Sequence, residues 1–125
     1  MHSPSLTAPF VVALLALPPA YAQKATEQFI PIGQSPGISG KLTWIGEIVA
    51  TDTRAGTLTL REAAAPVTVR LTDKTRIFLD RSKLKQSNQA GSFADLQKGR
   101  MAEVRYEGPA EAPTADWVKV EITQR

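Results

Sequence analysis

The sequence predicts an all-β protein: one small barrel of five or six short strands with a single short helical turn. Two observations favour this class. From residue 41 onward, apolar and polar residues alternate at period two in short segments, as half-buried strands require. The expected strands do not alternate with full helices, so a parallel α/β sheet is not expected. A closed or nearly closed barrel is favoured because it leaves few strand edges exposed.

The first 22 residues are expected to be a signal peptide. Residues 10–17 (FVVALLAL) form an unbroken apolar run, which is too short to span a bilayer because a spanning helix needs about 20 residues. Two prolines end it, and residues 20–22 (Ala-Tyr-Ala) place small side chains where a signal peptidase requires them. We expect cleavage near Ala22 and a periplasmic or secreted protein. The run lacks a preceding Lys or Arg, so the alternative is an N-terminal helix packed on the domain.

Residues 23–40 are rich in proline and glycine, which excludes a helix. Within them, Phe29–Ile32 is apolar enough to pack against other residues. We therefore expect an extended arm that lies on the barrel domain of residues 41–125. The alternative is a flexible linker.

The barrel is expected to begin with a hairpin of residues 41–52 and 57–62. In the first strand Trp44 and Ile48 share one face and Ile45 and Val49 the other, which indicates burial on both sides. Gly46 lies mid-strand, where glycine often marks a bulge or a bend.

Four further strand segments are expected at residues 67–71, 75–79, 101–106 and 115–122. Their alternation turns Val69, Val104 and Val118 toward the core. Residues 80–91 lack periodicity and are expected to form a loop. Residues 92–99 are expected to form one capped helical turn, with Ser92 at its start and Gly99 at its left-handed stop.

Two stretches carry a resemblance to known proteins. Gly46–Asp52 followed by Gly56–Leu60 has the pattern G-x-I-x-x-x-D…G-T-L-T-L, and Phe93–Gly99 precedes the strand at Met101–Tyr106. Together they resemble the small exported bacterial β-barrel domains of unknown function, which have an OB-like architecture. The resemblance covers about residues 42–122 and implies a fold. It supplies no catalytic residues, and fold alone does not imply function.

The composition excludes several chemistries. The chain has no cysteine and its one histidine is His2, which lies in the expected signal peptide. A Ser-His-Asp or Cys-His nucleophile is therefore excluded in the mature chain, and zinc or copper would lack their usual ligands. The periplasmic copper-binding barrels have a similar architecture and use His and Met beside a Trp, of which Trp44 and Met101 could imitate only a part. We expect no enzyme, no metal and no cofactor.

Five aspartates occupy expected turns or strand ends, where such side chains usually accept hydrogen bonds from their own backbone. A catalytic carboxylate pair and a calcium site are the less favoured alternatives, since no EF-hand-like spacing is present. These residues are Asp52, Asp73, Asp80, Asp95 and Asp116.

A candidate ligand surface combines a basic loop with residues on the outward phases of the strands. Barrels of this class bind oligonucleotides or sugars on such a face. The loop residues are Arg81, Lys83 and Lys85, and the strand residues are Arg70, Arg76, Phe78, Arg105, Trp117 and Lys119. Glutamates share these phases, so the alternative is an ordinary mixed-charge surface.

The sequence thus favours a non-enzymatic exported module that binds a protein or an anionic polymer. Nucleic acid is a less favoured ligand, because the excess of 15 basic over 12 acidic residues is small. The alternative function is a structural domain that makes protein–protein contacts through its arm or a sheet edge. The sequence leaves the partner and the oligomeric state open.

Overall fold

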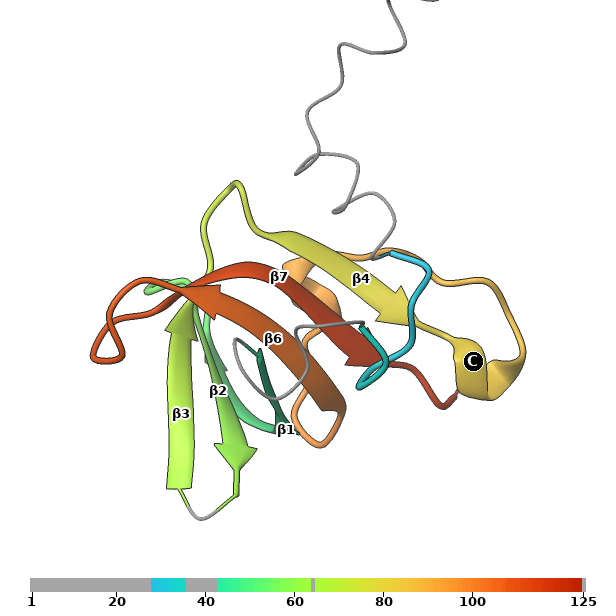
Figure 1. Cartoon of the computed structure of the whole chain (residues 1–125), viewed down its shortest axis with the longest axis horizontal. Coiled ribbons are helices and arrows are strands. Elements are labelled where there is room, and N and C mark those ends of the chain that lie inside the picture. Colours follow the sequence, from blue (N-terminus) through green and yellow to red (C-terminus); the bar gives the residue numbers. More distant parts are fainter. Residues whose placement is uncertain (1–27, 36–42, 64, 125) are drawn as a thin grey trace, which may run out of the picture.

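The computed structural model describes residues 28–35, 43–63 and 65–124. Within them it contains seven strands and two 3₁₀ turns, and the barrel of Figure 1 is built from them. The strands are β1 (Thr43–Asp52), β2 (Thr57–Glu62), β3 (Ala65–Arg70), β4 (Arg76–Asp80), β5 (Gln89–Ala90), β6 (Met101–Glu107) and β7 (Thr114–Glu121). The 3₁₀ turns are η2 (Ser82–Leu84) and η3 (Phe93–Asp95).

The strands follow the order β3-β2-β1-β6-β7-β4-β5, and a further pairing of β3 with β7 closes five of them into a barrel. That closing contact is parallel and joins Arg70 to Thr114. Strand β4 runs parallel to β7 beyond this point, and the short β5 pairs with β4. The prediction of an all-β, OB-like barrel is therefore confirmed, with two strands added to the closed five.

The predicted elements match the observed ones to within about two residues, and β2 matches at both ends. Two short elements fall in the predicted loop of residues 80–91, namely η2 and β5. Strand β5 has only two residues, which is too few for alternation to be visible in the sequence. The predicted helical turn is a 3₁₀ turn, in which the Asp95 carboxylate accepts a 2.8 Å hydrogen bond from the Ser92 amide. The turn ends at Asp95 with Leu96 as its C-cap, so Gly99 is not its stop. Gly99 does have the left-handed φ that was predicted, +96°, in the connection to β6.

Gly46 has a different role from the predicted one. The register of β1 against β2 shifts between Ile48 and Ala50, so the bulge lies beyond the glycine. A Cβ atom at position 46 would instead collide with the backbone carbonyl of Arg61 on β2. Glycine is needed there because the two backbones approach too closely for any side chain.

The interior of the barrel is filled by the residues that alternation predicted. Ile48, Leu60, Val69 and Val104 are buried in one apolar cluster with residues of β7. Burying each such side chain contributes about 1.5–3 kcal/mol. Trp44 packs against this cluster and stacks on Tyr106 with ring centroids 4.1 Å apart.

The outer face of β4, β6 and β7 is also buried, which corrects the predicted outward placement of three side chains. Phe78, Trp117 and Lys119 are all at most 3% exposed. For Lys119 the physical reason is a second layer: residues 28–35, the cyan segment in Figure 1, are held on this face by side chains of β4, β6 and β7. Lys119 in turn covers Trp117, because its Nζ lies 4.7 Å from the centroid of that ring. Alternation of apolar and polar residues along a strand predicts a solvent-exposed face of the sheet only when no other part of the chain covers that face.

Candidate functional site

Residues 28–35, here called the arm segment, are fixed by three hydrogen bonds to buried charged side chains. The Ile32 amide donates to Asp80 Oδ2, the Gly33 amide donates to Glu103 Oε1, and Lys119 Nζ donates to Ser35 Oγ, each at 3.0 Å. The segment turns on itself, since the Gln34 amide donates to the Pro31 carbonyl. The rest of the expected arm and the expected signal peptide lie outside the described residues.

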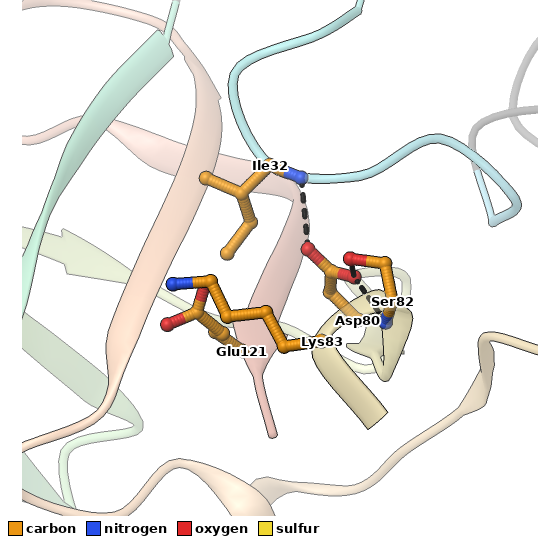
Figure 2. Close-up of polar contacts among 5 residues, drawn as sticks. All are labelled: Ile32, Asp80, Ser82, Lys83 and Glu121. Atoms are coloured by element: carbon orange, nitrogen blue, oxygen red, sulfur yellow. Dashed lines mark hydrogen bonds and ion pairs between the residues drawn. The ribbon is translucent and has the colours of Figure 1, made fainter. Parts of the chain in front are cut away.

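The carboxylate of Asp80 joins the arm segment to the turn η2, as Figure 2 shows. Its Oδ2 accepts from Ile32, while its Oδ1 accepts from the Ser82 amide at 3.0 Å and the Ser82 hydroxyl at 2.7 Å. Burial alone raises the pKa of Asp80, but these hydrogen bonds and the charge of Lys119 together hold the pKa below its ordinary value. Asp80 is therefore a structural anion rather than a proton carrier at neutral pH.

This pKa predicts a dependence of stability on pH. Because the folded-state pKa of Asp80 lies below its ordinary value of 3.8, the carboxylate stabilises the fold above that pH. The contribution is lost as the pH falls through the folded-state pKa. Asp80→Asn should therefore flatten the loss of stability below pH 3.8, measured by urea unfolding at a series of acidic pH values. Asp73→Asn, in an exposed turn, is the control, and equal slopes in wild type and Asp80→Asn would contradict the assignment.

The predicted groove between the basic loop and the aromatic residues of the sheet is not formed. Arg81 follows the last residue of β4 and Arg76 is the first, so at about 3.3 Å per residue their Cα atoms are about 16 Å apart. Phe78 and Trp117 are buried. Lys83 pairs with Glu121 at 3.1 Å (Figure 2).

The remaining predicted site residues are spread over the barrel. Arg76 and Arg105 lie on either side of Trp117 in one cross-strand row, where Arg105 pairs with Asp116 at 3.7 Å. Arg70 borders a separate pocket of about 190 Å³. Lys85 is exposed and follows η2. Of the nine residues, only Arg81 contributes to the pocket described next.

An open pocket of about 320 Å³ lies between η2, β5 and the end of the chain beyond β7. Its lining combines two arginines, three glutamines, one aspartate and three aliphatic side chains. These are Arg81, Arg100, Gln86, Gln89, Gln124, Asp95, Leu79, Leu84 and Ile122.

Both guanidinium groups of this pocket, here called the end pocket, are positioned by backbone carbonyls. Arg81 Nε donates to the Ser87 carbonyl at 2.7 Å, and Arg100 Nη1 donates to the Asp95 carbonyl at 2.9 Å. The Asp95 carboxylate is already engaged, because its Oδ2 accepts from the Ser92 amide and hydroxyl. Each arginine therefore keeps further N–H donors beyond the one used by the fold.

Sequence reasoning missed most of the end pocket. Most of its residues come from the predicted loop, from the position after the predicted helical turn and from the residues that follow β7, while Leu79 belongs to β4 and Asp95 to η3. No periodicity marks Arg100 or Gln124, and only the charge of the 81–85 loop provided a signal.

The comparisons with known proteins show neither a family nor a ligand for this chain. No family model and no curated protein matches the sequence. The crystal structure of silver(I)-bound CusF matches 62% of this chain and 93% of that chain at 12% identity, with a TM-score of 0.44. A copper(II) structure of a tryptophan-to-alanine variant of CusF from Escherichia coli matches 63% of this chain and 89% of that chain, at 9% identity and a TM-score of 0.46. At such identities neither likeness speaks to a ligand.

Trp44 and Met101, the two residues considered for a copper-like site, do not meet. Trp44 stacks on Tyr106, whereas Met101 is 38% exposed and lies opposite Glu47. Within the described ranges, no group of three or more histidine, cysteine, aspartate or glutamate side chains could hold a metal ion. In the same part of the chain, no helix is long and apolar enough to cross a membrane.

Proposed function

We propose that this protein is a non-enzymatic binding module that holds an anionic ligand in the end pocket. The observation that carries the proposal is the presence of two guanidinium groups in one pocket, each held by a backbone carbonyl. Arginines fixed in this way lose little side-chain entropy when they bind a carboxylate or phosphate, and they can do so with two parallel hydrogen bonds.

The charges in the end pocket favour an anion. Arg81 and Arg100 supply two positive charges against the single carboxylate of Asp95, which already accepts hydrogen bonds from Ser92. In the same lining, Leu79 and Ile122 provide apolar contact area of the kind that small-molecule sites use.

The same groups argue against catalysis. General acid–base chemistry needs a titratable group with a pKa near the working pH, positioned toward the substrate. Arginine remains protonated at any such pH, and the Asp95 carboxylate is occupied by the start of η3. The end pocket therefore suits binding without bond making or breaking.

We expect affinity for an anionic polymer to depend on salt and on Arg100. Charge-assisted hydrogen bonds contribute about 1.5–3 kcal/mol each, so Arg100→Gln should weaken binding of an acidic polysaccharide by roughly tenfold or more. Added salt should weaken the wild type more than the variant, because fewer ions are released on binding to the variant. Calorimetric titration at low and moderate salt measures both effects.

The control for this titration is Arg54→Gln, in the exposed turn after β1. It removes the same charge from the protein but leaves the end pocket intact. If both variants lost equal affinity, net charge rather than the pocket would account for binding.

The proposal includes export. The apolar run and the Ala-Tyr-Ala sequence at residues 20–22 imply that the leader is removed. We expect the intact mass of protein from the periplasm or the medium to correspond to a chain that begins at Gln23. A full-length mass would refute the signal peptide.

A second candidate function is protein–protein contact through the arm segment. Phe29 is 65% exposed although the segment that carries it is held on the barrel. Aromatic side chains, phenylalanine included, are enriched at protein–protein interfaces. Absence of binding to every anion at low salt would favour this function.

A further inference from the structure

The end pocket contains polar groups that charge recognition alone does not require. Gln86, Gln89 and Gln124 contribute three primary amides to its lining. Each amide can donate and accept hydrogen bonds at once. Sugar hydroxyl groups have the same dual capacity, whereas a phosphate or carboxylate oxygen only accepts.

The apolar part of the lining fits the same chemistry. Leu79, Leu84 and Ile122 are aliphatic, and none of the described lining residues is aromatic. Sites for single-stranded nucleic acid depend on aromatic side chains on which bases stack, each worth about 1–3 kcal/mol per base. The weaker, aliphatic surface suits the C–H face of a sugar ring better than it suits a base.

The size and the net charge of the pocket restrict the class of ligand further. About 320 Å³ lies at the lower end of the range for small-molecule sites, which is enough for one sugar unit. Two arginines and one aspartate leave a single net positive charge. This balance matches one carboxylate better than the higher charge of a phosphate monoester.

We infer that the end pocket binds one carboxylated sugar unit of an acidic saccharide, an inference that rests on the proposed function and specifies its ligand class. The carboxylate lies against Arg81 and Arg100, the hydroxyl groups contact the glutamine amides, and the ring lies on the aliphatic residues. The pocket is open to solvent, so neighbouring units of a polymer can continue beyond it.

The test compares three probes by isothermal titration calorimetry on the full mature protein at low salt. The probes are an oligogalacturonate, a neutral oligogalactose of equal length and an oligothymidylate. We expect the oligogalacturonate to bind at least tenfold more tightly than either of the other two. Gln124→Ala should weaken its binding several-fold, while Gln97→Ala, outside the pocket, should not change it.

Each other outcome overturns the inference. Tighter binding of oligothymidylate, or binding of oligogalacturonate that Gln124→Ala leaves unchanged, would mean that the pocket recognises charge only. Either result leaves the proposed anion-binding function intact. If neither anionic probe binds, the proposed function fails together with the ligand class.

Discussion

Val104→Asp should leave the protein unfolded at room temperature. Val104 lies in the middle of β6, opposite Trp44 on β1 and Val118 on β7, and is fully buried in the barrel. An aspartate there would bury a carboxyl group with neither a counter-charge nor a hydrogen-bond partner in the apolar interior, which is costly whether the group ionises or takes up a proton. The cost is several kcal/mol, against a total stability of about 5–15 kcal/mol for a domain of this kind. Circular dichroism during urea or thermal unfolding measures the loss.

The adjacent residue provides the control. Arg105 lies on the opposite face of β6, is partly exposed and pairs with Asp116 at 3.7 Å. Such partly exposed ion pairs contribute about 0–1 kcal/mol, so Arg105→Ala should be mild. If Arg105→Ala were the more damaging change, the side chains of β6 would face the opposite way from the description above.

Lys119→Met should release the arm segment and destabilise the fold by about 3–5 kcal/mol, the usual cost of removing one partner from a buried charged group. Lys119 is 1% exposed, donates to Ser35 and lies in register with Glu103, which is fully buried. Without the ammonium group, the carboxylates of Glu103 and Asp80 would remain buried under the arm segment with no cation from β7. Urea unfolding measures the stability, and hydrogen exchange of the Ile32 and Gly33 amides reports release of the arm segment.

A double variant separates the loss of an ion from the loss of packing. Glu103→Gln combined with Lys119→Met removes both charges and keeps an oxygen that can accept from the Gly33 amide, and removing both partners of a buried charge pair often restores stability. We expect the double variant to be more stable than Lys119→Met alone. Lys98→Met, at an exposed turn, is the matched control. A Lys119→Met protein as stable as this control would show that the buried charges do not hold the arm segment.

The positions and inward faces of most barrel strands could be predicted from the sequence, because each strand turns one face toward a single apolar core. The pairs Leu58–Leu60 and Val118–Val120 alternate with polar residues, and that period alone gives the strands and their inward faces. The same rule failed on the other face of β7, because Trp117 and Lys119 are covered from outside. The sequence indicated that Phe29–Ile32 would pack, but no local pattern specifies which surface an arm covers.

The end pocket was less predictable for a related reason. Arg81 and Arg100 are 19 residues apart in the sequence. They line the same pocket only because the chain between them folds back on itself. Each arginine is positioned by a backbone carbonyl. Every residue has such a carbonyl, so the sequence does not indicate which of them accepts the hydrogen bond. Charge clustering therefore found the loop at residues 81–85 but not the pocket beside it.

The most direct test of the central claim is to map the ligand contact at residue level. We would titrate ¹⁵N-labelled mature protein with an oligogalacturonate and follow the backbone amide shifts by NMR. The end pocket as the binding site predicts shifts concentrated at residues 81–89, at Arg100 and at residues 122–124. Shifts confined to β2 and β3, or to the arm segment, would contradict it.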